Sequence, residues 1–139
     1  YPIYRDDDEG KREADYNEIR LAEIYYSLAE CKFKANDVDG AAKLLNAVRK
    51  RNYPQDTWAE CLYKPEGTVT LTQDELYDEW GREFLAEGRR RTDLIRWGLY
   101  CTEEWWDKKP DADSHWDIFP IPRDMMGADH TLKQNPGYN

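Results

Sequence analysis

Hydrophobic residues recur at steps of three and four along the first third of the chain, in residues 15–36 and again in residues 39–51. The apolar positions are Ile24, Tyr25, Leu28 and Cys31, and then Ala41, Leu44, Leu45 and Val48. This spacing places side chains in one stripe along an α-helix. Because the stretch "DVDG" leaves only a short turn between the two segments, the pattern predicts an antiparallel pair of helices.

This pair fits the register of a tetratricopeptide repeat, which has a large ring, a leucine, small residues between the helices and a closing proline. The residues in phase are Tyr25, Leu28, Ala29, Ala41 and Leu45, with Pro54 one position late. Short side chains let two helices approach closely. The register therefore favours stacked helical hairpins, although a single unit does not establish an array.

A helix start follows residues 52–71, a stretch with two prolines, a glycine and no sustained period, which indicates a loop. Thr72 is a favoured N-cap residue, and Glu75 three positions later completes a capping box. Leu71 and Leu76 are placed for a hydrophobic staple across this start. The sequence therefore predicts a helix that begins directly after Thr72.

The predicted helix continues through Phe84 and Leu85 to Gly88, and a fourth helix spans about residues 89–100. A loop rich in tryptophan and aspartate follows, and then a tail punctuated by prolines. Strand-type alternation is absent from the sequence pattern. We therefore predict an all-α fold with tetratricopeptide-like helical hairpins, long irregular loops and an extended C-terminal tail, in one α-helical domain over residues 1–139.

Composition restricts the functions that this fold can carry. The chain is 40% hydrophobic, 35% charged and 14% aromatic, which is typical of a folded globular domain. Its net charge of -9 repels phosphate backbones, so nucleic acid is not an expected partner. No apolar run approaches the ~18 residues of a membrane span. The N-terminus lacks a signal-peptide pattern, and we expect the sequence to be a fragment of a longer chain.

Metal-binding and disulfide patterns are weak. The three cysteines have no CxxC spacing, and a Cys61–Cys101 disulfide stays open as an alternative in an oxidising compartment. His115 and His130 lack partners at ligand spacing, so neither a metal nor a cofactor is predicted. The acidic run at residues 6–9 is interpreted as a solvated loop, with a weak Ca²⁺ site as its alternative.

Three successive arginines stand in "EGRRRTDLIRWG", residues 87–98, where an anion site and an internal charge network are the two interpretations. The pairs at helical spacing are Glu87 with Arg90 and Arg91, and Asp93 with Arg89 and Arg96. A carboxylate within one turn of each arginine favours the internal network. The whole predicted network comprises Arg20, Glu23, Glu83, Glu87, Arg90, Asp93 and Arg96.

A glycosidase acid pair is the enzymatic alternative for Glu83 and Glu87, which lie four residues apart. Such enzymes place two carboxyl groups across a cleft and raise the pKa of one of them. Neighbouring arginines would instead lower the pKa of both carboxyl groups. We therefore predict no catalytic residues and no enzyme activity.

Four segments in order carry a family resemblance: "RLAEIYYSLAE" (20–30), "LNAVRKR" (45–51), "REFLAEGRRRTDLIRWG" (82–98), and "FPIP" followed by "LKQNPGY" (132–138). Together they resemble the C-terminal region of the SusD/RagB family of outer-membrane, glycan-binding lipoproteins. The departures from the family pattern are Trp80, Phe84, Met125 with Met126, and Asp129 with His130.

The resemblance implies a function. Members of the family are helical, with a tetratricopeptide-like scaffold, and are lipid-anchored at the cell surface of Bacteroidetes. They bind oligosaccharides without turnover and deliver them to a TonB-dependent outer-membrane transporter. The expected partners are therefore an oligosaccharide or polysaccharide, this transporter and the remaining N-terminal part of the chain. The alternative is a tetratricopeptide-like protein-interaction scaffold, and a glycoside hydrolase is the weakest third class.

The family's sugar-contacting residues lie mainly in its larger N-terminal part, so no residue is carried over by motif. Rings outside the predicted helices are the local candidates, because pyranose faces are apolar and stack on aromatic side chains. These candidates are Trp58, Tyr63, Trp105, Trp106 and Trp116. The alternative is that the rings pin long loops to the helices, and we expect at most one or two of them to be exposed near a groove. The two prolines of "FPIP" further predict that Phe119 and Ile121 are buried in a tail lying across the helices.

Overall fold

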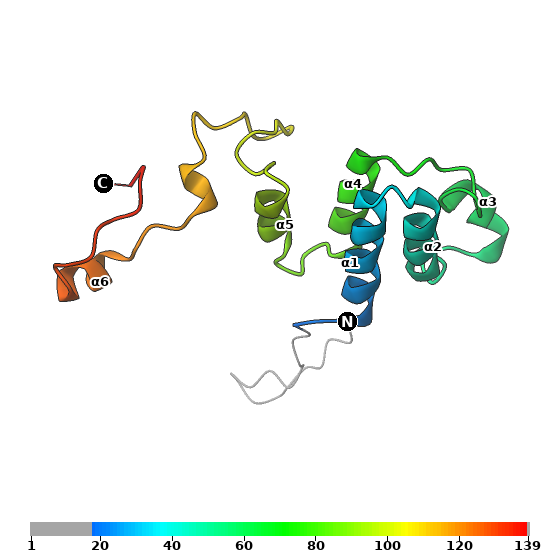
Figure 1. Ribbon diagram of the computed structural model, residues 1–139, viewed down its shortest axis with the longest axis horizontal. Helices are drawn as coiled ribbons and strands as arrows, with labels where there is room; N and C mark the ends of the chain where they lie inside the picture. Colours follow the sequence, from blue (N-terminus) through cyan, green and yellow to red (C-terminus); the bar gives the residue numbers. More distant parts are fainter. Residues whose placement is uncertain (1–17, 139) are drawn as a thin grey trace, which may run out of the picture. The chain divides into compact units, whose positions relative to one another are not determined.

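The computed structural model describes residues 18–138, and they are organised by helices (Figure 1). In chain order the elements are α1 (Leu21–Lys34), α2 (Val38–Arg49), the 3-10 helix η1 (Gln55–Thr57), α3 (Trp58–Cys61), α4 (Gln73–Glu83), α5 (Arg90–Arg96), the 3-10 helix η2 (His115–Asp117) and α6 (Arg123–Ala128). Across residues 18–138 the backbone forms two isolated β-bridges and no strand. The predicted all-α fold is confirmed.

The contacts of the chain divide it into two compact units, one ending at Trp80 and the other beginning at Gly81. Unit 1 refers below to the described residues up to Trp80, and unit 2 to those from Gly81 to Tyr138. Each unit has its own packing. A single domain over residues 1–139 stays a prediction.

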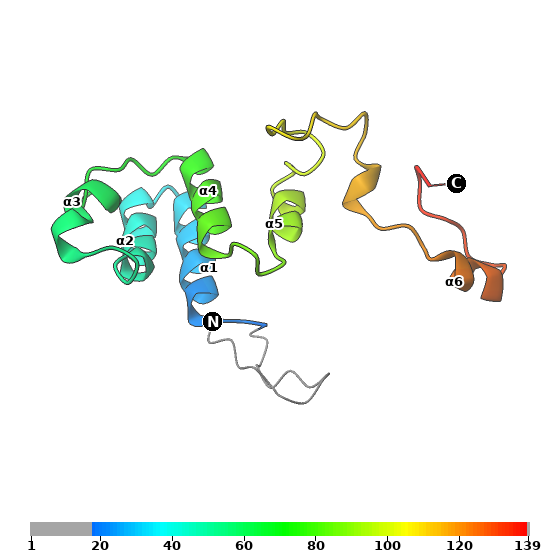
Figure 2. The ribbon, with the colours of Figure 1, turned by 180° about the vertical axis from the view of Figure 1, so that it is seen from behind.

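Helices α1 and α2 form a helical hairpin at the centre of unit 1. Asp37 is the N-cap of α2, since its side chain accepts a hydrogen bond from the Gly40 backbone N–H at 2.9 Å. Ala29, Ala41 and Leu45 are completely buried, as the tetratricopeptide register predicts. Helix α4 lies beside α1 in both views (Figures 1 and 2). The predicted tetratricopeptide-like hairpin is therefore present.

The buried side of α1 differs from the side with the largest apolar residues. Ala22, Tyr26 and Ala29 are buried, whereas Ile24 is 55% exposed and Leu28 is 48% exposed. Small residues face α2 because they let the helices approach closely, and Tyr26 fills the space beside α4. Its ring meets that of Trp80 edge-on, with 5.6 Å between the centroids. Periodicity identified a stripe on α1 but not the side that packs.

The start of α4 agrees with its sequence pattern. The Glu75 backbone N–H donates to Thr72 Oγ1 at 3.2 Å, so the predicted cap is confirmed, and both residues of the predicted staple, Leu71 and Leu76, are buried. The loop predicted before α4 was only partly right, because it contains the short helices η1 and α3. Helices of three and four residues are too short to show a period in the sequence.

Helices α4 and α5 are both shorter than predicted. Helix α4 ends at Glu83, five residues before Gly88, and α5 covers Arg90–Arg96. Ala86 and Gly88 both have positive φ angles, which end the helical path between the two elements. Phe84 is consequently buried, while Leu85 is 79% exposed. The apolar pattern through Leu85 therefore overestimated the length of this helix.

The tail of unit 2 is held by contacts between its two proline-containing motifs. The Gln134 side chain bonds to both the N–H and the C=O of Ile121, at 2.8 and 2.9 Å. Asn135 Nδ2 donates to the Phe119 carbonyl at 2.8 Å, and the Tyr138 hydroxyl donates to the Ile118 carbonyl at 2.7 Å. "FPIP" and "QNPGY" thus close a loop around α6, a short helix that the sequence pattern did not predict.

The predicted burial of "FPIP" is only partly right. Phe119 is 69% exposed, so its predicted burial is wrong, and Ile121 is half-buried. The Phe119 ring instead lies against the Arg91 guanidinium, whose carbon is 3.9 Å from the ring centroid. A cation over an aromatic face needs one side of the ring only, so the other side stays open.

Candidate functional site

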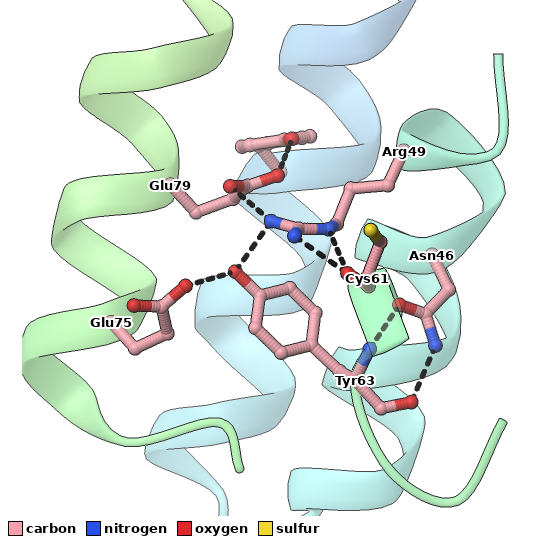
Figure 3. A network of polar contacts seen from close by, with 7 residues as sticks. Asn46, Arg49, Cys61, Tyr63, Glu75 and Glu79 are labelled. Carbon is pink, nitrogen blue, oxygen red and sulfur yellow. Dashed lines mark hydrogen bonds and ion pairs between the residues drawn. The ribbon is translucent and has the colours of Figure 1, made fainter. Parts of the chain in front are cut away.

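A buried polar network centred on Arg49 fixes the segment that carries Trp58 and Tyr63 (Figure 3). The guanidinium forms an ion pair with Glu79 of α4, and both side chains are less than a tenth exposed. It also donates twice to the Cys61 carbonyl, at 2.6 and 3.1 Å, and once to the Tyr63 hydroxyl at 3.0 Å. Arg49 therefore joins α2, α4 and the end of α3.

The same network orders the backbone and the ring of Tyr63. The Asn46 side chain bonds both the N–H and the C=O of Tyr63 at 2.8 Å, as a neighbouring strand would (Figure 3). The Tyr63 hydroxyl donates to Glu75 at 2.8 Å, and the Tyr26 hydroxyl donates to Glu79 at 2.8 Å. Burial and the negative charge of Glu79 raise the pKa of Tyr63 well above its ordinary value.

Tyr63 is therefore removed from the sugar-contacting candidates. Its side chain is completely buried, and its hydroxyl serves Arg49 and Glu75. A ring can stack on a pyranose only where one of its faces is accessible. The sequence placed Tyr63 in a loop without period, and that pattern does not distinguish a ring that anchors the loop from one that projects out of it.

Trp58 lies half-buried at the start of α3. Its indole N–H donates to the Tyr53 carbonyl at 2.9 Å, and Lys50 Nζ lies 4.9 Å from the ring centroid. Unit 1 also has a groove of about 510 Å³, lined by Asp39, Gly40, Lys43, Ala47, Lys50, Pro65 and Glu66. Trp58 does not line this groove, although its neighbour Lys50 does.

Trp105 and Trp106 begin a tight turn that presents one ring to solvent. The backbones of Trp105 and Lys108 exchange two hydrogen bonds, at 2.9 and 3.2 Å. Lys108 Nζ lies 5.3 Å from the Trp105 ring centroid and pairs with Asp111 at 2.7 Å. Trp105 is thereby held half-buried, while Trp106 at the tip is 97% exposed. The turn fixes the backbone of Trp106 and leaves its ring accessible.

Trp116 belongs to a cluster of three rings in unit 2. Its centroid lies 4.5 Å from that of His115 and 5.8 Å from that of Tyr138. Gly137 approaches His115 so closely, with a φ of 89°, that a side chain at this position would collide with the His115 ring. The cluster supports one side of Trp116, whose ring is 49% exposed. Trp106 and Trp116 are therefore the two exposed candidates.

The arginine-rich helix α5 supports this region. Arg91 donates to the Trp116 carbonyl at 2.7 Å, in place of the carboxylate that helical spacing predicts for it. Arg96 Nε lies 2.9 Å from Asp93, whose side chain is 4% exposed, and this ion pair of the predicted network is present. Arg90 and Arg96 also lie near the Trp97 ring, at 5.8 and 4.6 Å from its centroid.

The rest of the predicted charge network, which adds Arg20, Glu23, Glu83 and Glu87, stays a prediction. Within the described residues, no group of three or more His, Cys, Asp or Glu residues could hold a metal ion, and no helix is long and apolar enough to cross a membrane. The acidic run at residues 6–9 lies outside the described residues. All three cysteines are free thiols, so the structure contains no Cys61–Cys101 disulfide.

Cys101 is the most protected of these thiols. It is buried and donates to Asp117 Oδ1 at 3.3 Å. Burial raises the pKa of the Cys101 thiol, the neighbouring carboxylates of Asp117 and Asp111 act in the same direction, and together they bring this pKa to about 11. A neutral thiol at this position links the loop after α5 to η2.

The fold and these surfaces define a class of helical-hairpin protein whose aromatic rings are presented by supported loops. Comparison with known proteins identifies the family: residues 5–138 match the SusD family, and the chain belongs to it. The starch-binding protein SusD of Bacteroides thetaiotaomicron is 36% identical over 148 residues, which cover 97% of this chain and 24% of that protein.

Two further relatives agree. SusD-like protein P25 of Formosa agariphila is 36% identical over 82 residues, covering 58% of this chain and 15% of that protein. A solved SusD-like protein from Bacteroides fragilis superposes with a TM-score of 0.60 and 25% identity, covering 86% of this chain and 25% of that one. The chain therefore spans about a quarter of the length of SusD and of this solved relative.

Proposed function

We propose that this chain is the C-terminal helical part of a glycan-binding protein that acts in nutrient uptake at the outer membrane. The observation that carries the proposal is the 36% identity to a starch-binding protein over 97% of the chain. In this proposal the protein is lipid-anchored at the cell surface and passes oligosaccharides to a TonB-dependent transporter. It binds glycans without cleaving them, as the name of the starch-binding relative supports.

Within this function, Trp106 and Trp116 are the rings of this chain best placed to touch a glycan. Trp106 is 97% exposed on a turn with two backbone hydrogen bonds, and Trp116 is backed by His115 and Tyr138. The Trp116 ring is held by its neighbouring rings and loses little conformational freedom when a pyranose stacks on it, whereas for Trp106 the turn fixes the backbone that carries the ring. Trp58 and Trp105 are half-buried and are secondary candidates, and helices α1, α2 and α4 form the scaffold.

The experiment is a binding screen of the full-length protein against a panel of polysaccharides by affinity electrophoresis. Retardation by at least one polysaccharide, with no release of reducing sugar during the incubation, is the expected result. A protein that binds none of them would favour the alternative, a tetratricopeptide-like interaction scaffold. Release of reducing ends would instead indicate a hydrolase and contradict the proposal.

The contribution of the two exposed rings is tested with paired substitutions on the retained polysaccharide. Trp106→Ala and Trp116→Ala should each weaken binding by about 5-fold or more, since a ring that anchors a ligand contributes more than ~1 kcal/mol. Trp106→Phe and Trp116→Phe keep an aromatic face and should retain most of the affinity. If the alanine and phenylalanine variants both bind as the wild type does, the glycan is held by other parts of the protein.

A further inference from the structure

A pocket of unit 1 lies between the end of α1 and the first turns of α4. Its volume is about 290 Å³. Three of its side chains are apolar or aromatic and three are polar, namely Phe33, Leu76, Tyr77, Lys34, Asn36 and Gln73. We call it the α1–α4 pocket. Such a mixture of apolar surface and a few polar groups is typical of a site for a small molecule.

Both walls of the α1–α4 pocket are fixed by the fold. At the end of α1 the Asn36 backbone N–H donates to the Phe33 carbonyl at 2.9 Å, and Asn36 has a φ of 63°, a left-handed conformation that asparagine tolerates. On the other wall Leu76 is buried in the core. The Tyr26 hydroxyl donates to Glu79 at 2.8 Å and joins the two helices. A pocket that is already formed spares its ligand the cost of ordering it.

Two carboxamides of the pocket have hydrogen-bonding groups available for a ligand. Gln73 Nε2 donates to the Tyr77 hydroxyl at 2.8 Å, while the Gln73 amide oxygen has no partner among residues 18–138. The Asn36 carboxamide has no partner in the same part of the chain. A carboxamide both donates and accepts hydrogen bonds, as a hydroxyl group does. The two side chains therefore match neighbouring hydroxyl groups of a ligand.

The charges around the pocket are balanced, which favours an uncharged ligand. Lys34 is the only charged residue of the lining, and its ammonium group pairs with Glu30 at 2.7 Å. Asp74 and Glu75 occupy the first turn of α4 and offset the positive end of its helix dipole. An anion at this end of α4 would meet these two carboxylates. A neutral, hydroxyl-rich molecule meets no such penalty.

We propose that the α1–α4 pocket is a saccharide subsite that takes one neutral pyranose unit of the glycan. The apolar C–H face of the sugar lies against Phe33 and Leu76, and two of its hydroxyl groups bond to Asn36 and Gln73. This subsite rests on the proposed function and extends it from the exposed rings of unit 2 to the scaffold helices of unit 1. A single sugar ring binds weakly, so the pocket strengthens the binding of a longer glycan that the same protein also holds elsewhere.

The first test compares full-length variants by affinity electrophoresis in the polysaccharide that retains the wild type most strongly. Gln73→Ala removes one carboxamide, and Asn36→Gly removes the other while keeping the left-handed backbone. Each should weaken binding by about 5-fold, the usual effect of one lost hydrogen bond. The matched control is Asp74→Ala, an exposed neighbour on α4 that does not line the pocket, and it should leave binding unchanged.

Hydroxyl-radical footprinting of the full-length wild type locates the sugar without any substitution. The probe is an oligosaccharide prepared from the same polysaccharide, and oxidation is measured on separate peptides by mass spectrometry. Phe33 and Tyr53 are both half-buried, and only Phe33 lines the pocket. Oxidation of Phe33 relative to Tyr53 should fall by about 2-fold or more, because a pocket and its ligand cover each other's surface.

The possible results separate this subsite from the proposed function. Unchanged affinity of both carboxamide variants, or an unchanged ratio of Phe33 to Tyr53 oxidation, would overturn the subsite while the retained wild type still supports glycan binding. Retention by acidic polysaccharides alone would contradict the neutral ligand. If no polysaccharide retains the wild type, the proposed function fails and the subsite fails with it.

Discussion

Substitution of Arg49 by methionine should destabilise this protein more than any surface charge change nearby. The guanidinium is buried with Glu79, and their side chains are 8% and 5% exposed. Arg49→Met removes the ion pair, two hydrogen bonds to the Cys61 carbonyl and one to the Tyr63 hydroxyl. Removing one partner of a buried ion pair leaves the other charge buried and uncompensated, which lowers the free energy of unfolding by about 3–5 kcal/mol.

The neighbouring residue supplies the matched control for this prediction. Lys50 also forms an ion pair, with Glu66, but both side chains are about a third exposed. Water screens such a pair, so Lys50→Met should cost at most about 1 kcal/mol. Both variants are made in the full-length protein, and unfolding by urea is followed by far-UV circular dichroism.

A double variant tests the physical reason for the loss. Glu79→Gln removes the buried charge but keeps an oxygen that can accept the hydrogen bond from the Tyr26 hydroxyl. The variant with both Arg49→Met and Glu79→Gln should therefore be more stable than Arg49→Met alone. The reasoning is refuted if Arg49→Met costs no more than Lys50→Met, or if the double variant loses the sum of the two single losses.

Three further results follow from unit 2. The Cys101 pKa of about 11 lies above the 9.0 of an ordinary thiol, so the folded state binds the thiol proton more tightly than the unfolded state does. The free energy of unfolding should therefore fall as the pH rises from about 9 to 11. Cys101→Ser should lessen this fall, measured by urea unfolding at pH 8, 9, 10 and 11. Gly137→Ala should lower the free energy of unfolding by about 1–3 kcal/mol and weaken the near-UV circular dichroism signal of the Trp116 cluster. The control Gly127→Ala, a position in α6 with open space around it, should leave that signal unchanged. Gln134→Ala removes the side chain that joins the two tail motifs and should increase proteolysis of the tail, and unchanged cleavage would contradict the closed loop.

The local structure of this protein could largely be predicted from sequence, because its determinants lie within one or two helical turns. The hairpin of α1 and α2 was visible in the spacing of Ala29, Ala41 and Leu45, all of which are buried. The start of α4 was visible in Thr72 and Glu75. The ordered motifs that identified the family also lie in continuous segments of the chain.

The aromatic candidates show where sequence reasoning ended. Trp106 and Tyr63 are both rings in segments without helical period, yet one is 97% exposed and the other is completely buried. Tyr63 is buried by residues 12 and 14 positions away, since Glu75 and Arg49 bind its hydroxyl, whereas Trp106 lies exposed at the tip of a local turn closed by Trp105 and Lys108. Contacts between residues 12 or more positions apart leave no periodic pattern.

The all-α fold, the helical hairpin and the family could be inferred from sequence alone, because helical spacing, capping and motif order are properties of neighbouring residues. The tertiary structure alone decided which side of α1 packs and which partner Arg91 takes. It also decided that "FPIP" and "QNPGY" bind each other. Such choices depend on the shape and the polar groups that a second segment brings, and a single segment of sequence does not contain them.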